Sequence, residues 1–112
     1  MKRNNPKKEV GMKLLMLMCI EEYAKDLRKI LLQHQVPIFS ETNIDGFRLE
    51  EGEVASNWFS SGGRRGIYSH LFFSFLAASK TGELMNTVRE YNEKNGDGHP
   101  LRAFLLDVEE HV

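Results

Sequence analysis

The chain has 112 residues, of which 41% are hydrophobic and 28% are charged, and its formal net charge is -1. This length and composition are typical of one globular domain, which excludes a multidomain enzyme and a disordered chain. The near-neutral charge gives no reason to expect a nucleic-acid partner, and the longest apolar run, residues 14–20, is too short for direct membrane insertion.

The chain is expected to begin with a flexible basic tail at residues 1–11, followed by a single domain at residues 12–112. The tail contains four Lys or Arg residues, one Glu, Pro6 and Gly11. The single cysteine, Cys19, has no partner for an internal disulfide, which fits the reducing cytoplasm.

The first two elements are a strand and a helix. Residues 13–20 are almost continuously apolar and predict a buried strand. The following segment predicts a helix, because its apolar side chains recur at helical spacing and form one stripe of Tyr23, Leu27, Ile30 and Leu31. Its charged residues are interpreted as a solvated face. Pro37 disfavours helical geometry at residue 36, so we expect the helix to end there.

Two further strands are predicted at residues 38–44 and 67–76. The second of these is rich in aromatic side chains, with Leu71, Phe73 and Phe75 on one face. The connection between them, residues 45–66, contains five glycines. Since hairpin loops usually have about 2–5 residues, a connection this long indicates a functional loop.

The last elements complete a known pattern. Residues 81–95 predict a second helix with an apolar stripe of Leu84, Met85, Val88 and Tyr91. A turn at residues 96–100 precedes the last strand, residues 101–108. The order β-α-β-β-α-β predicts an α+β, ferredoxin-like fold, in which a four-stranded antiparallel sheet carries both helices on one face.

This fold leaves one face of the sheet without a cover. The strands at residues 13–20, 67–76 and 101–108 carry apolar side chains at both alternating sets of positions. A bare face that is this apolar is expected to be buried against other copies of the chain, which predicts a symmetric oligomer.

The long loop contains the candidate binding residues. Trp58 and Phe59 either pack on their own domain or form the partner-docking part of the loop, since Trp is enriched at the energetic centres of interfaces. In the segment 60–66, glycine amides and two guanidinium groups suit an anionic ligand such as a phosphate, although a solvated turn has the same composition. The candidate ligand-binding residues in this segment are Gly62, Gly63, Arg64 and Arg65.

No catalytic or metal-binding motif is recognisable. The histidines at positions 34, 70, 99 and 111 lie on separate predicted elements without helical i, i+4 spacing. His70 is interpreted as a packed or interface residue, and His99 and His111 as exposed residues. Cys19, within an apolar strand, is expected to be an unreactive thiol. We therefore expect that the chain is not an enzyme and has no metal site.

The sequence resembles the PII family of nitrogen-regulatory signal proteins, and in particular its divergent PII-like branch. The resemblance covers residues 12–110 and rests on the apolar strand at 12–20, the long loop after the second strand and the ending 101–110. It implies a homotrimer with inward-facing sheets, in which the T-loop, here 45–66, docks on a membrane transporter or an enzyme. It also implies an effector, usually an adenine nucleotide, between subunits.

The turn before the last strand corresponds to the phosphate-binding segment of that family. Here it contributes Gly96 and Gly98 as candidate ligand-binding residues, and residues 95–99 include no Lys or Arg. Two other classes share the order of elements: a small dimeric α+β barrel enzyme of the monooxygenase or isomerase type, and a metal-binding trimer similar to the CutA proteins.

Overall fold

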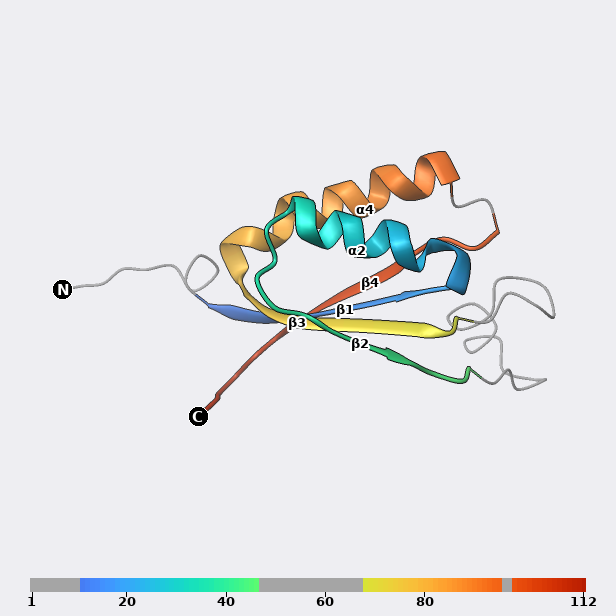
Figure 1. Cartoon of the computed structure of the whole chain (residues 1–112). Helices are drawn as coiled ribbons and strands as arrows, with labels where there is room; N and C mark the ends of the chain where they lie inside the picture. The colour runs from blue at the N-terminus through green and yellow to red at the C-terminus, as the bar shows by residue number, and fades with distance from the viewer. Residues whose placement is uncertain (1–10, 47–67, 96–97) are drawn as a thin grey trace, which may run out of the picture.

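The computed structural model describes residues 11–46, 68–95 and 98–112. Its elements follow the order predicted from the sequence: β1 (Met12–Cys19), the short 3-10 helix η1 (Glu21–Tyr23), α2 (Ala24–Gln33), β2 (Ser40–Asn43), β3 (His70–Ala77), the 3-10 helix η2 (Ala78–Lys80), α4 (Thr81–Asn95) and β4 (Arg102–Asp107). The four strands form one antiparallel sheet in the order β2-β3-β1-β4, and both helices lie on the same face of it (Figure 1). The predicted ferredoxin-like α+β fold is confirmed.

The strand register decides which side chains face the helices. Leu17 of β1 lies opposite Phe72 of β3 and Ala103 of β4, so these three side chains share one face. Leu17 and Phe72 are almost completely buried, and Ala103 packs against the same core. Because side chains alternate along a strand, the adjacent positions face the opposite side, which we call the open face.

The core fills the space between the sheet and the two helices. It contains the apolar stripe predicted for each helix: Leu27, Ile30 and Leu31 of α2 and Leu84 and Val88 of α4 are buried. Polar contacts join the helices as well. The hydroxyl of Tyr91 donates to Asp26 at 2.7 Å.

The end of α2 differs from the prediction that Pro37 stops the helix. The last helical residue is Gln33, and Gln35 adopts a left-handed conformation with φ of 59°. The N–H groups of Gln35 and Val36 donate to the carbonyls of Leu32 and Leu31. This pattern is a Schellman motif. It ends the helix at Gln33, four residues before Pro37.

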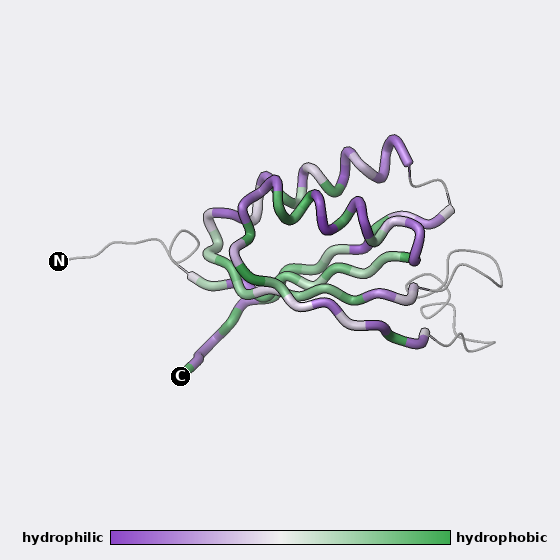
Figure 2. Tube along the Cα trace, in the orientation of Figure 1, coloured by the Kyte–Doolittle hydropathy of each residue, from purple (hydrophilic) through white to green (hydrophobic). Residues whose placement is uncertain are grey.

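The open face of the sheet is apolar, as the sequence predicted. Figure 2 shows hydrophobic residues along most of β1, β3 and β4, whereas β2 is largely hydrophilic. Phe75 and Leu106 are 56% and 45% exposed there. The register places eight large apolar side chains on this face: Leu14, Met16, Met18, Leu71, Phe73, Phe75, Phe104 and Leu106.

Candidate functional site

The two ends of the long connection and the turn before β4 meet at one end of the sheet. There β1 and β2 end, and β3 and β4 begin, with Cys19 opposite His70 and Met18 opposite Arg102. Ile44 donates its N–H to the carbonyl of Ser69 at 2.9 Å. This bond joins the residue after β2 to the residue before β3. We call this region the loop-side end.

A buried tyrosine links the segment before β3 to the turn before β4 by a hydrogen bond. Tyr68 is 1% exposed, and its hydroxyl donates to the carbonyl oxygen of Pro100 at 2.6 Å. The bond crosses from the segment before β3 to the segment before β4, which are 32 residues apart in sequence. A displacement of either segment must therefore break this bond or move the other segment.

The turn before β4 combines a glycine with positive φ and a buried histidine nitrogen. Gly98 has φ of 129°, a conformation that side chains rarely adopt, so glycine is required there. His99 follows it, and its Nδ1 is buried without a hydrogen-bond partner among the described residues. A buried polar atom of this kind is unusual in folded proteins and suggests a site for a ligand or a water molecule.

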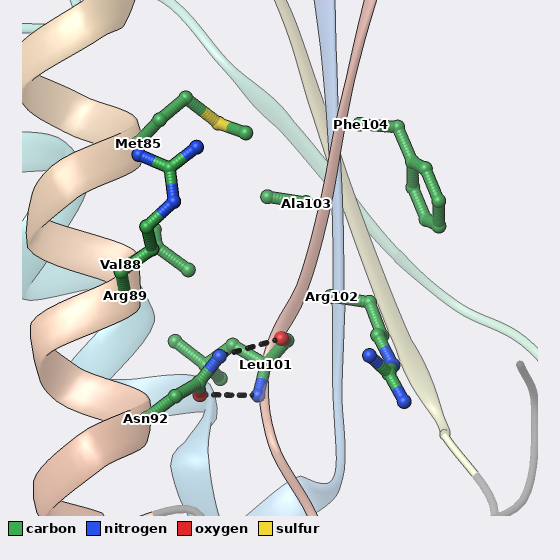
Figure 3. Close-up of a pocket in the computed structure, with 8 residues that line it drawn as sticks. All are labelled: Met85, Val88, Arg89, Asn92, Leu101, Arg102, Ala103 and Phe104. Carbon is green, nitrogen blue, oxygen red and sulfur yellow. Dashed lines mark hydrogen bonds between the residues drawn. The ribbon is translucent and has the colours of Figure 1, made fainter. Parts of the chain in front are cut away.

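A groove of about 510 Å³ lies between α4 and β4, next to this turn. Figure 3 shows Met85 and Arg89 of α4 on one side of it and Ala103 of β4 on the other, with Asn92 hydrogen-bonded to Leu101, while Arg102 points to the other side of the strand. Arg102 therefore lies at the start of β4 on the open face, and Arg89 lies on the helix side. Of the two, Arg102 lies closer to the turn in sequence, and residues 95–99 contain no Lys or Arg.

The start of the loop is fixed by an ion pair. Arg28 of α2 donates through Nε and Nη2 to the two carboxylate oxygens of Glu41, at 2.8 and 2.7 Å. These hydrogen bonds hold the pKa of Glu41 below its usual value and raise that of Arg28. The pair anchors β2 to α2 just before the chain enters the long connection.

The thiol of Cys19 lies under α2 at the same end. Cys19 is fully buried, and burial, with a smaller contribution from the charge of Glu41, raises the pKa of the thiol to about 12. A protonated, buried thiol is a poor nucleophile, in line with the sequence prediction. His70, opposite Cys19, is also buried, and its Nδ1 lies 3.0 Å from the hydroxyl of Ser69.

Most candidate residues from the sequence lie outside the described residues. Only Gly98 is described, on the turn at the loop-side end. The others fall in the ranges 47–67 and 96–97: Trp58, Phe59, Gly62, Gly63, Arg64, Arg65 and Gly96.

Sequence reasoning missed three described residues of the site: Tyr68, His99 and Arg102. His99 was expected to be exposed but is half-buried. The sequence signal for Arg102 is a basic residue two positions after the glycine-containing turn at residues 96–100.

The residues that the structure describes, 11–46, 68–95 and 98–112, contain neither a cluster of metal-ligating side chains nor a membrane-spanning helix. In these ranges no three His, Cys, Asp or Glu side chains are close enough together to hold a metal ion. Neither of the two helices combines the length and the apolar character that crossing a bilayer requires.

Comparison with known proteins relates the chain to others by structure alone. No family model and no curated protein matches the sequence. A DUF3240 family protein from Shewanella baltica OS155 has 19% identity and a TM-score of 0.62, over 91% of this chain and 94% of that chain. CPII from Thiomonas intermedia K12, in a structure bound to ADP, AMP and acetate, has 12% identity and a TM-score of 0.64, over 92% of this chain and 91% of that chain.

A second structure of CPII, described as a nitrogen regulatory PII-like protein, is bound to ADP, AMP and bicarbonate. It has 11% identity and a TM-score of 0.56, over 91% of this chain and 97% of that chain. The fold of the chain is therefore that of the PII-like proteins, as the sequence resemblance predicted.

Proposed function

We propose that this chain is a PII-like regulatory protein, not an enzyme, which binds a small anionic effector and docks on a membrane transporter or an enzyme through residues 45–66. The bond between Tyr68 and Pro100 is the observation that carries the proposal, because it joins the return of the loop to the turn before β4. Binding of an effector at this turn then changes the loop that meets the target.

An adenine nucleotide is the first effector to test. CPII, which shares the fold, has been solved with ADP and AMP. In our proposal the phosphates are held by the amides of Gly62, Gly63, Gly96 and Gly98 and by the guanidinium groups of Arg64 and Arg65. Two described residues support this assignment: the buried Nδ1 of His99 has no hydrogen-bond partner among the described residues, and Arg102 supplies a positive charge that residues 95–99 lack.

The proposed working form is a homotrimer in the cytoplasm. The open face supports an assembly, because seven of its eight large apolar side chains stay partly or largely exposed in one chain and only Met18 is buried. A buried free thiol is compatible with a reducing compartment. Trp58 and Phe59 are assigned to the docking part of the loop.

Titration calorimetry with ADP, AMP and sodium bicarbonate tests the proposal. The double variant R64A/R65A should weaken nucleotide binding by roughly a hundredfold, because two charge-assisted hydrogen bonds are lost. R102A should weaken it by about tenfold. The matched control K25A/K29A removes two positive charges from an exposed part of α2 and should leave the affinity unchanged.

Two outcomes of the calorimetry would contradict the proposal. Failure of all three compounds to bind at millimolar concentration would refute the proposed effector class. Binding that is unaffected in both arginine variants would place the site elsewhere in the molecule.

A further inference from the structure

Two tyrosines join the helices at the loop-side end, where α2 begins and α4 ends (Figure 1). The hydroxyl of Tyr23, the N-cap residue of α2, donates at 2.8 Å to the carbonyl oxygen of Asn95, the last residue of α4. The hydroxyl of Tyr91, near the end of α4, donates at 2.7 Å to a carboxylate oxygen of Asp26 in the first turn of α2. Each tyrosine therefore bonds across to the end of the other helix.

The two rings also contact each other, which closes the network. Their centroids are 5.5 Å apart and their planes meet at 79°, a favourable edge-to-face arrangement. The side chain of Asn95 donates to the carbonyl of Tyr91 at 3.3 Å. We call Tyr23, Asp26, Tyr91 and Asn95 the tyrosine clasp. Because three of its members contact one another in a cycle, the loss of one bond is expected to loosen the others.

Packing of the rings does not explain the bond to Asn95. The carbonyl of Asn95 is one of the last four of α4, which have no partner within the helix. Since Asn95 is exposed, water could satisfy this oxygen if a phenylalanine ring filled the space of Tyr23. What the hydroxyl adds is a fixed position for the point at which the chain leaves α4.

Side chains also fasten the chain on the other side of the turn, just before β4. The carbonyl of Pro100 accepts from Tyr68, and the backbone of Leu101 bonds twice to the side chain of Asn92, at 2.7 and 3.0 Å (Figure 3). Since Asn95 precedes Pro100 by only five residues, a displacement of the end of α4 changes the path available to the chain between them. The clasp therefore fixes where this connection begins, and the other bonds fix where it ends.

We propose that the tyrosine clasp positions residues 98–101, before β4, for the effector, with Tyr23 and Tyr91 as positioning residues. This inference rests on the proposed function and adds residues that set the affinity without contacting the ligand. An effector binds only those molecules in which the turn is in its binding position, so the apparent dissociation constant is inversely proportional to their fraction. Loosening the clasp lowers that fraction and should weaken binding, although no contact with the effector is removed.

Another hydrogen bond between the helices provides a matched control. Nε2 of His34 lies 2.7 Å from the hydroxyl of Thr87. Thr87 precedes Asn95 by eight residues, about 12 Å along α4. T87V removes this hydroxyl at nearly constant shape, so it should lower stability about as much as Y23F does while the clasp stays intact.

Two measurements on the wild type, Y23F, Y91F and T87V test the inference. Amide hydrogen exchange by NMR, without any ligand, follows the N–H of Leu101. It should be about three- to tenfold faster in Y23F and Y91F than in T87V, the effect of one lost hydrogen bond. Titration calorimetry with ADP should show a loss of affinity of about the same size in Y23F and Y91F, and an unchanged affinity in T87V.

Variants of Asp26 separate the hydrogen bond from the charge. D26N keeps an oxygen that can accept from Tyr91, and D26A removes it, whereas both lose the negative charge near the start of α2. In both measurements D26A should match Y91F, and D26N should match the wild type. An equal change in D26N and D26A would contradict the role of the bond, because the charge alone would then explain the effect.

The remaining outcomes are equally distinct. Equal changes in Y23F and T87V would overturn the inference, because a loss of stability would then account for both. Unchanged exchange at Leu101 in a folded Y23F protein would overturn it as well. If the wild type binds neither ADP, AMP nor bicarbonate, the proposed function fails, and the exchange rates still decide whether the clasp positions the turn.

Discussion

Gln35 adopts a left-handed backbone conformation that is unfavourable for a residue with a side chain. It is the one non-glycine residue with positive φ among the described residues, and its side chain is exposed. A left-handed conformation costs an L-residue roughly 1–2 kcal/mol, whereas glycine adopts it without strain. Q35G should therefore raise the free energy of unfolding by about 0.5–1 kcal/mol in a urea titration. Q35V, which is β-branched, should lower it, and the opposite order would mean that the Schellman motif does not limit stability.

The thiol of Cys19 makes the fold sensitive to alkaline pH. Its pKa is raised to about 12 from an ordinary value of 9.0, chiefly by burial. Between these values the unfolded chain loses the proton and the folded chain keeps it, so the unfolded state binds fewer protons. Stability must therefore fall as the pH rises from 9 towards 12.

Thermal unfolding at a series of pH values measures this effect. The melting temperature of the wild type should decline more steeply above pH 9 than that of C19A, which lacks the group. Tyr91, whose pKa is also raised by burial and by its bond to Asp26, is present in both proteins and cancels in the comparison. Parallel declines would show that the thiol does not contribute.

Among the elements, α4 is held to the sheet by buried leucine contacts. Leu84 is 0% exposed, so L84A removes apolar surface and leaves a cavity, which should cost about 2–5 kcal/mol in chemical unfolding. L32A is the matched control on α2. Leu32 is 66% exposed, and its loss should change stability by no more than about 0.5 kcal/mol. Equal effects of the two variants would mean that the described core is not the one that stabilises the fold.

The elements were more predictable from the sequence than the site was. The limits of α4 and the two faces of β3 follow from periodicity, because burial of one stripe is a local constraint that each segment displays. The contact of Tyr68 with Pro100 joins segments that are 32 residues apart, and no local pattern reports such a contact. The end of α2 was also misplaced, since a left-handed Gln35 has no sequence signal comparable to that of a glycine.

At the scale of the whole molecule, the open face predicts that a single charge can prevent assembly. Because the last strand is apolar at both alternating sets of positions, its sequence alone does not decide whether Phe104 or Leu105 lies on the open face. The structure places Phe104 on the open face and packs Leu105 against the core. If the chain assembles through this face as proposed, F104E should convert the oligomer to folded monomers in light scattering, because an unpaired charge is costly in an apolar interface.

The control for this prediction places the same charge elsewhere. Lys25 lies exposed on α2, and K25E should leave the oligomer intact. An assembly that survives F104E at micromolar concentration would show that the open face is not its interface.

The two ends of the long connection lie on neighbouring strands, so the length of the connection can change at little cost in stability. Asn43 and His70 lie opposite each other on paired strands, so the intervening chain leaves and re-enters the sheet at neighbouring points. The free energy of closing a loop rises by only about 0.6 kcal/mol for each doubling of its length. Insertions, deletions or complete exchange of that segment are therefore inexpensive for the fold. Natural variation, or a designer grafting a new recognition sequence, can change what the proposed docking loop binds while the sheet and the hydrogen bond between Tyr68 and Pro100 stay as they are.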